Sequence, residues 1–309
     1  RSRKKAVLGR AGGAIGRNDS NVVVIEALRD ITMSLKMGDR VGLVGHNGAG
    51  KSTLLNCIAG LLDVSDGQIF INGKNVTWEQ PKDRGIGMVF QHFSLFDALT
   101  VEENIAIGIS PELARGNLNR RVREVSAQYG LPLDPARYVH TLSVGERQRI
   151  EVVRCLLQSP KLLIMDEPTS VLTPQEVVEL FKTLRRLSDE GVSILYISHK
   201  LQEIKELCHV ATIMRVGEVV DNCIPSEESP RSMAEMMRGE NLVSPEKPEN
   251  TIEGAPHLVV RDLSLESSDQ HGVDLKEINM QVHTGEILGI AGIAGNGQLE
   301  LMAVLSGEI

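Results

Sequence analysis

The feature that most constrains the fold of this chain is the stretch GLVGHNGAGKSTLL, residues 42–55. A short apolar run enters a glycine-rich bend, and the bend leads into a second apolar segment with helical spacing. The spacing Gly45-x-x-x-x-Gly50-Lys51-Ser52 lets backbone N–H groups converge on anionic oxygens at the start of a helix. The stretch therefore predicts a strand, a phosphate-binding loop and a helix, in that order.

Further apolar runs of strand length follow in the first two thirds of the chain, and they suit strands buried on both faces of a mostly parallel sheet. These runs are RVGLVG, GIGMVF, KLLIMD and SILYIS. Between the last two, Thr173 and Pro174 predict the start of a helix, and Gly191 predicts its end. The fold class is therefore α/β, and we expect a helical insertion near residues 95–150.

A second stretch, GIAGIAGNGQLELM, repeats the same pattern 247 residues later. Gly38, Gly42 and Gly60 have counterparts at this offset, and matched glycines mark matched backbone bends. In the second stretch Gln298 and Leu299 stand where Lys51 and Ser52 stand in the first. The offset predicts a duplicated domain whose second phosphate loop is degenerate.

The repeat divides the chain into four expected parts. A basic, glycine-rich flexible tail covers residues 1–20, and the first domain covers residues 21–220. A turn-rich, polar connector covers residues 221–256, in which MAEMMRGENL predicts a short helix that ends at Gly239. The start of a second domain, which we expect to be cut short, covers residues 257–309.

The overall charge argues against a nucleic-acid partner, because the formal net charge is -8 and no global basic field is present. The basic tail is the local exception, and anionic lipid is its alternative partner. No apolar run in the sequence approaches the length of a membrane span.

Polar residues follow three of the apolar runs, at the ends of predicted strands. Asp166 and Glu167 end KLLIMDEP, and paired acids there suit a metal-side carboxylate and a water-activating carboxylate. The alternative is two solvated acids. His199 follows SILYIS and could contact a terminal phosphate, although a lone histidine is more often structural. Gln91 follows GMVF, where it is either a magnesium ligand or a surface glutamine.

These motifs, together with LSVGERQR at residues 142–149, resemble those of ABC-type ATPases in both order and spacing. LSVGE is similar to the signature loop of that family. Lys51 precedes Gln91 by 40 residues, Ser143 precedes Asp166 by 23, and Asp166 precedes His199 by 33. The resemblance covers residues 21–220 fully and residues 257–309 in part. It implies a P-loop NTPase fold of the ABC type with a helical subdomain.

The resemblance also implies roles for individual residues. Glu167 would be the general base for water, His199 the switch histidine, and Gln91 a third residue of the catalytic group. The signature residues would bind the γ-phosphate of another ATP across a dimer interface; they are Ser143, Val144, Gly145 and Glu146. The alternative, compatible with this role, is a capped amphipathic helix in which Ser143 is the N-cap. The Mg²⁺ ligands would be Ser52, Gln91 and Asp166. The ATP-binding residues would be Gly45, His46, Asn47, Gly48, Ala49, Gly50, Lys51, Ser52, Thr53, Gln91, Asp166 and His199.

The chain departs from the family pattern in three places. Val144 and Glu146 replace the commoner glycine and glutamine of the signature loop. The segment SVLT, residues 170–173, lacks an aspartate that many relatives have after this strand. No aromatic residue lies near Val22–Val24, where the family often stacks one on adenine.

The tandem layout resembles the double ATPase subunits of importers for ribose, galactose and nucleosides. It implies transmembrane permease subunits as partners, a substrate-binding protein as an indirect partner, and a peripheral place on the cytoplasmic face of the cell membrane. A second ATPase unit would come from further residues of the chain or from a homodimer. The first 60 or so residues instead resemble ATPases of polysaccharide exporters. A polysaccharide or O-antigen exporter is therefore one alternative, and a soluble tandem ATPase is the other.

The segment HFSLFDAL, residues 92–99, is the expected contact with the membrane partner. Phe93, Leu95 and Phe96 suit docking onto a cytoplasmic helix. The alternative is that these side chains pack inside the helical insertion, and the sequence weighs both equally.

Overall fold

The computed structural model describes residues 14–17, 23–91, 93–239, 254–267, 272–292 and 296–308. His92 of the expected docking segment, Val22 and residues 1–13 of the expected tail lie outside these ranges. The chain divides into two compact units, Arg1–Leu242 and Val243–Ile309.

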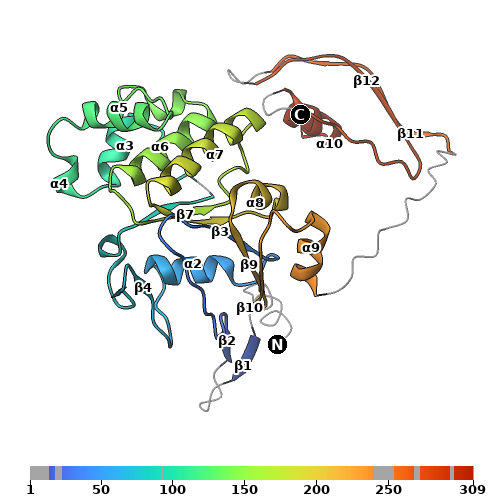
Figure 1. Ribbon diagram of the computed structural model, residues 1–309. Helices are drawn as coiled ribbons and strands as arrows, with labels where there is room; N and C mark the ends of the chain where they lie inside the picture. Colours follow the sequence, from blue (N-terminus) through green and yellow to red (C-terminus); the bar gives the residue numbers. More distant parts are fainter. Residues whose placement is uncertain are drawn as a thin grey trace. The chain divides into compact units, whose positions relative to one another are not determined.

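A six-stranded sheet in the order β10-β9-β3-β8-β7-β6 forms the centre of the first unit (Figure 1). Neighbouring strands are parallel except β10, which pairs antiparallel to β9 at one edge. The four predicted apolar runs supply β3, β6, β7 and β8, so the prediction of a mostly parallel sheet is confirmed. The strands are β3 (Arg40–Val44), β6 (Ile86–Val89), β7 (Leu162–Asp166), β8 (Ser193–Ile197), β9 (Val210–Arg215) and β10 (Glu218–Cys223).

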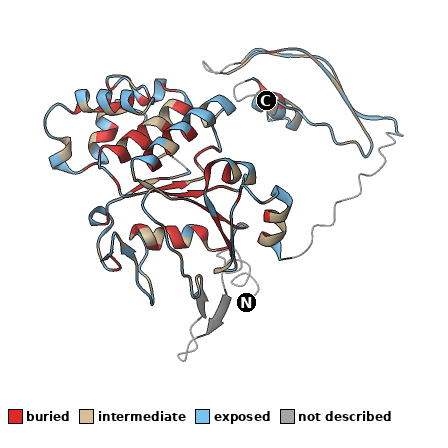
Figure 2. Cartoon of the chain, viewed as in Figure 1, coloured by how far each residue is buried: buried red, intermediate tan, exposed pale blue. Residues whose placement is uncertain are grey.

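Successive side chains of the central strands enter two different cores, because the side chains of a strand alternate between its faces. On β8, Ile194 and Tyr196 belong to one core, whereas Leu195 and Ile197 belong to the other. Figure 2 shows buried residues along the sheet and along the helices above and below it. Each fully buried Leu, Ile or Met side chain contributes about 1.5–3 kcal/mol.

Helices cover both faces of the sheet. Leu54 and Leu55 of α2 fill one core, and α2 lies on its own side of the sheet in Figure 1. The other core receives side chains from the helices of the opposite layer and also from Met237 of α9 (Pro230–Arg238). The helices are α2 (Lys51–Ala59) on the first side, and α3 (Val101–Ile107), α5 (Leu118–Gln128), α6 (Val144–Leu156), α7 (Pro174–Asp189) and α8 (Leu201–Leu207) on the second.

Helix α7 shows how local sequence sets an element. The Thr173 hydroxyl accepts from the Glu176 N–H, the Glu176 carboxylate accepts from the Thr173 N–H, and Pro174 occupies the first turn. This capping box satisfies N–H groups that have no partner inside the helix. The apolar side of this helix faces the core, where Phe181 and Leu184 are fully buried.

The predicted helical insertion is present. It consists of α3, α5 and the first part of α6, together with α4 (Pro111–Ala114) and a 3₁₀ turn, η2 (Val139–Thr141). A hairpin of β4 (Phe70–Ile71) and β5 (Lys74–Asn75), followed by the 3₁₀ turn η1 (Pro81–Asp83), lies between α2 and β6.

Two of the expected boundaries differ in the structure. Ala14–Arg17 lies within the range expected to be a flexible tail, but it forms strand β1 and pairs antiparallel with β2 (Val23–Glu26). The expected connector begins at residue 221, yet β10 continues to Cys223 and helix α9 (Pro230–Arg238) follows. Met233 and Met237 of α9 are buried, so these residues belong to the first unit. The short helix that ends at Gly239 is confirmed.

The second unit contains an antiparallel pair, β11 (Pro256–Leu265) and β12 (Leu275–His283), and helix α10 (Gln298–Ser306). Both ends of α10 lie 247 residues after the ends of α2, and left-handed glycines flank both helices. The repeated pattern also implies a strand before the second glycine-rich bend, which the offset of 247 from β3 places at residues 287–291, and this strand is not formed. Ile287 is 96% exposed, since the described part of this unit offers no neighbours like β8 and β9.

Among the helices in the described ranges, none is both long enough and apolar enough to cross a membrane.

Candidate functional site

The phosphate loop connects β3 to α2, as predicted. Gly48 and Gly50 adopt φ of 82° and 99°, a left-handed conformation that glycine reaches without strain. Helix α2 begins at Lys51 with no side-chain cap and no acidic residue in its first turn. Its first N–H groups and its positive dipole end therefore face an uncapped position, which suits an anion.

Lys51 is nine-tenths buried, with 9% of its surface exposed. Its ammonium group donates to the carbonyls of Gly45 and His46, at 2.5 and 3.0 Å. Burial lowers the pKa of Lys51, and the nearby carboxylates of Glu167 and Asp166 act in the opposite direction. The Lys51 ammonium group is thus held against the phosphate loop.

A cleft of about 300 Å³ opens beside this loop. It brings together residues from the loop, from the start of α2 and from the ends of β6 and β7, which lie far apart in the sequence. The lining residues are Asn47, Gly48, Gly50, Lys51, Ser52, Thr53, Gln91, Asp166, Glu167 and Ile197. All but Ile197 were predicted site residues.

The remaining loop residues have other positions. Gly45 and Ala49 are buried and support the loop from behind, and Ala49 packs in the core beneath it. His46 is exposed. These three residues are not part of the cleft lining. The carbonyls of Gly45 and His46 accept from Lys51, the His46 carbonyl also accepts from the Ala49 N–H, and the Ala49 carbonyl accepts from the Gly217 N–H.

Asp166 and Glu167 end β7 at the floor of the cleft. Burial raises the pKa of Asp166, the charge of Glu167 raises it further, and Lys51 opposes both effects. Glu167 has φ of 47°, a left-handed conformation that costs a residue with a side chain about 1–2 kcal/mol. Its N–H group donates to the carbonyl of Ile197 at 3.0 Å, which ties it to the end of β8.

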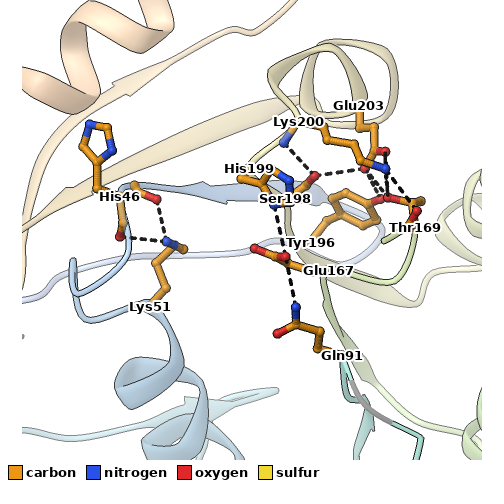
Figure 3. Close-up of polar contacts among 11 residues, drawn as sticks. His46, Lys51, Gln91, Glu167, Thr169, Tyr196, Ser198, His199, Lys200 and Glu203 are labelled. Atoms are coloured by element: carbon orange, nitrogen blue, oxygen red, sulfur yellow. Dashed lines mark hydrogen bonds and ion pairs between the residues drawn. The ribbon is translucent and has the colours of Figure 1, made fainter. Parts of the chain in front are cut away.

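Glu167 joins two of the predicted residues (Figure 3). Its Oε2 accepts a hydrogen bond from Gln91 Nε2 at 3.4 Å, and it lies 3.1 Å from His199 Nδ1. His199 does not line the cleft itself and remains 59% exposed. The three side chains come from the ends of β6, β7 and β8, which meet at one edge of the parallel sheet.

Behind His199 lies a group of polar side chains, buried except for Lys200, that the sequence did not single out. Figure 3 shows Thr169, Tyr196, Ser198 and Lys200 converging on Glu203. No local pattern marks these residues as a set. Tyr196 lies on β8, Thr169 and Ser198 lie in the loops that follow β7 and β8, and Glu203 lies on α8.

The signature residues lie at the start of α6. The Ser143 hydroxyl accepts from the N–H of Glu146, and the Glu146 carboxylate accepts from the N–H of Ser143. Arg137 Nη1 pairs with Glu146 Oε1 at 2.7 Å. The N-cap interpretation of Ser143 is therefore confirmed, and Glu146, a departure from the family pattern, completes the cap. The hydroxyl proton of Ser143 is not used in this box.

Gly145 and Val144 differ in their surroundings. A Cβ at Gly145 would lie 1.7 Å from Glu176 Oε1, so a side chain does not fit there unless Glu176 moves. Val144 is 42% exposed on the first turn of α6. None of the four signature residues lines the cleft beside Lys51.

The donor set at the cleft suits Mg²⁺ bound together with phosphate. Within the described ranges, no cluster of three or more His, Cys, Asp or Glu side chains could hold a metal ion. The predicted ligands are the carboxylate of Asp166, the hydroxyl of Ser52 and the amide oxygen of Gln91. Mg²⁺ takes oxygen ligands and is usually held by one or two carboxylates plus substrate phosphates, so this set fits.

Comparison with known families and structures agrees with this geometry. The profile of the family described as ABC transporter matches residues 28–170. The chain contains an ABC transporter ATP-binding domain. A nucleotide-free ATP-binding cassette from an ABC transporter is similar in structure, with a TM-score of 0.58, 26% identity and coverage of 64% of this chain and 85% of that one. The cbiO1 structure from Clostridium perfringens has a TM-score of 0.57 at 28% identity and covers 70% of this chain and 88% of its own.

Relatives with assigned names match most of the chain. The glucose import ATP-binding protein TsgD13 of Haloferax volcanii is 37% identical over 90% of this chain and 56% of its own. The nucleoside import ATP-binding protein NupA of Lactococcus lactis is 38% identical over the same two shares, 90% and 56%. The guanosine import ATP-binding protein NupO of Bacillus subtilis is 37% identical over 92% and 57%. The chain thus spans a little over half the length of these relatives.

Proposed function

We propose that the first unit binds Mg²⁺-ATP at the cleft and hydrolyses it. The observation that carries this proposal is the meeting of Glu167 with Gln91 and His199 directly beside Lys51 and the phosphate loop. The outer phosphates would lie against Lys51 and the uncapped start of α2. Mg²⁺, held by Ser52, Gln91 and Asp166, would neutralise charge on the phosphates when bound.

The chain's own groups then account for the proton transfer. Glu167 accepts a proton from water, the water oxygen bonds to the γ-phosphorus, and the bond from that phosphorus to the bridging oxygen breaks, which gives ADP and phosphate. His199 contacts the same carboxylate oxygen and orients it toward the cleft. Gln91 constrains the carboxylate from the other side. General base catalysis of this kind contributes about 10²–10⁴-fold to a rate.

A complete site needs a signature loop from a second ATPase unit. The Ser143 hydroxyl and the N–H groups of Val144 and Gly145, which take no part in the capping box, would form an anion site, and these residues lie outside the cleft of their own unit. We infer that two units face each other, so that Ser143, Val144, Gly145 and Glu146 of one contact the ATP held by Lys51 of the other.

This arrangement can be tested by mixing two inactive variants, Lys51→Ala and Ser143→Arg. In a mixed dimer one site combines an intact loop from one copy with an intact signature from the other. Random pairing makes half of the dimers mixed with one working site each, so the mixture should recover about a quarter of wild-type turnover. Recovery of no turnover would overturn the trans arrangement.

We further propose that hydrolysis drives import of a nucleoside or simple sugar through membrane permease subunits, with a substrate-binding protein acting indirectly. The unit would then sit peripherally on the cytoplasmic face of the membrane. Import is favoured over polysaccharide export and over a soluble tandem ATPase because the relatives at 37–38% identity carry import in their names.

The segment after Gln91 is the proposed contact with the permease. Phe96 is 60% exposed, whereas Leu95 packs against the core and Phe93 is half-buried. Of the two interpretations made from the sequence, docking suits the exposed Phe96 and core packing suits Leu95. A protruding Phe96 beside a supported backbone suits insertion into a groove of a partner.

The function is tested by comparing the wild-type chain with Lys51→Ala for ATP binding and with Glu167→Gln for turnover. We expect Lys51→Ala to lose ATP affinity. We expect Glu167→Gln to keep ATP affinity and lose at least 99% of turnover, the lower end of general base catalysis. Equal turnover in wild type and Glu167→Gln would overturn the assignment of the base.

A further inference from the structure

The buried polar group behind His199 is built around one carboxylate. Glu203 lies on α8 and is only 8% exposed. Its oxygens accept from the Thr169 hydroxyl at 2.6 and 2.7 Å, from the Tyr196 hydroxyl at 2.8 Å and from the Ser198 hydroxyl at 2.9 Å. Lys200 Nζ pairs with Glu203 Oε1 at 3.2 Å. We call these five residues the Glu203 network.

The network matches what a carboxylate can accept. An ionised carboxylate has about four lone-pair positions and no proton to donate. Three hydroxyls and one ammonium group fill them. Each hydroxyl has a single proton, and Lys200 supplies a positive charge, so the buried charge is both hydrogen-bonded and paired. A neutral side chain of the same shape cannot satisfy all four partners.

The position of the network links the two loops that carry the proposed catalytic groups. Thr169 lies two residues after Glu167, on the loop that follows β7. Ser198 directly precedes His199, on the loop that follows β8. Lys200 Nζ also donates to the carbonyl of Thr169 at 3.0 Å, and the Lys200 N–H donates to Ser198 Oγ at 3.0 Å. One carboxylate therefore holds both loops.

Both loops need such support. Glu167 has a left-handed backbone, and such strain persists only where the surrounding contacts fix it. His199 is mostly exposed and has Glu167 as its contact in the site, so its ring direction depends on the backbone that Ser198 and Lys200 hold. A shift of about 1 Å between reacting groups can reduce a rate about 100-fold.

We propose that Glu203 is a positioning residue for the proposed hydrolysis: through Thr169 and Ser198 it holds the Glu167 and His199 loops in register. It does not touch the nucleotide cleft. This inference rests on the proposed function, because it assigns a further residue to the same reaction.

The first test is Glu203→Gln, with Glu206→Gln as a matched control. Glu206 lies on the same helix, is exposed and pairs with Arg185 on the surface. We expect Glu203→Gln to lower kcat for ATP about 10- to 100-fold, while KM for ATP and the ATP Kd change less than about twofold. ATP affinity should be kept because Glu203 does not line the cleft. Glu206→Gln should match wild type in all three quantities.

Thr169→Val is the second variant, because it removes one hydroxyl with little change of shape and leaves Glu203 in place. We expect a smaller loss of kcat than in Glu203→Gln, again without a change in KM. In the double variant Thr169→Val, Glu203→Gln, the fold-loss of kcat should be smaller than the product of the two single losses, since both substitutions act through the same carboxylate. The melting temperature of each variant is measured alongside.

Three results would overturn the inference. One is a kcat for Glu203→Gln equal to that of Glu206→Gln. Another is a loss of kcat, ATP affinity and melting temperature together in both Glu203→Gln and Thr169→Val, which would indicate only a structural role. The third is a fully multiplicative loss in the double variant. Wild-type turnover no higher than that of Glu167→Gln would instead overturn the proposed function, and with it this inference.

Discussion

Replacement of Arg84 by methionine should destabilise the first unit strongly, although the acceptors that its guanidinium contacts are backbone carbonyls rather than carboxylates. Arg84 is 5% exposed. Its guanidinium donates to the carbonyls of Cys57 and Ile58 at 2.8 Å each, Thr77 at 2.8 Å and Glu79 at 2.9 Å. Cys57 and Ile58 lie in the last turn of α2, where the carbonyls lack the usual partner four residues on. The Cys57 carbonyl also accepts from the N–H of Gly60 at 3.2 Å.

The size of the effect follows from these four bonds. A hydrogen bond to a charged group contributes about 1.5–3 kcal/mol, so four would give about 6–12 kcal/mol. That sum is too large, because removing the guanidinium from water costs several kcal/mol when it is buried. Some of the carbonyls also regain water in the variant. We therefore expect the free energy of unfolding to fall by about 3–5 kcal/mol, the range for breaking a buried charged network.

Urea unfolding of Arg84→Met, compared with Arg120→Met, measures this loss. Arg120 is exposed and pairs with Glu124 on the surface of α5, and such a pair contributes about 0.3–0.5 kcal/mol. Because Arg84 holds the end of the helix that starts at Lys51, ATP affinity should fall as well. A loss in Arg84→Met within about 1 kcal/mol of that in Arg120→Met would refute this reasoning.

Three further predictions concern the site and its surface. Asp166→Asn should raise the melting temperature of the nucleotide-free chain at pH 7. The pKa of the wild-type Asp166 carboxyl is raised in the folded state. The contribution of Asp166 to stability is therefore present below its unfolded pKa and lost as the pH rises through its folded pKa. Calorimetry should show this gain shrink toward pH 4, near the ordinary aspartate pKa of about 3.9; a gain independent of pH would contradict it. Gly45→Ala should destabilise by about 1–3 kcal/mol and weaken ATP binding, because the added Cβ would lie 2.5 Å from the carbonyl of Met214; unchanged urea unfolding would argue against the tight loop. Phe96→Asp should change the free energy of unfolding by less than about 0.5 kcal/mol while it removes binding to permease subunits; a large loss of stability would mean that Phe96 is part of the core.

The sequence predicted the elements whose signals are local. The runs that became β3, β6, β7 and β8 are apolar over their whole length, and Thr173 and Ser143 have a glutamate three residues later, which is the pattern of a capping box. Glycines at both ends marked α2 and α10. In each case the cause of the structure lies within about ten residues of sequence.

The sequence did not predict the features that depend on contacts between residues far apart in the chain. The run at residues 287–291 resembles β3, yet no strand forms there, because a parallel strand needs partners and the described part of the second unit offers none beside it. The burial of Met233 and Met237 depends on contacts with elements of the first unit, so α9 could not be distinguished from a connector by its composition.

The same distinction applies to the site. The loop residues and the acids at the end of β7 follow known spacing, so most of the cleft lining could be predicted. Glu203, Thr169 and Arg84 could not. Thr169 reaches Glu203 from 34 residues away, and Arg84 reaches the carbonyls of Cys57 and Ile58 from 27 and 26 residues away. Nothing in their immediate neighbours differs from an ordinary polar surface. Their importance becomes visible only from burial and hydrogen bonding.

The measurement that tests the central claim most directly is ATP hydrolysis as a function of protein concentration, for the wild-type chain and for Glu167→Gln. The account predicts that wild-type activity rises faster than linearly with concentration, because a second copy supplies Ser143 and Gly145, and that Glu167→Gln loses this activity. Turnover that is strictly linear in concentration, or that survives in Glu167→Gln, would contradict it.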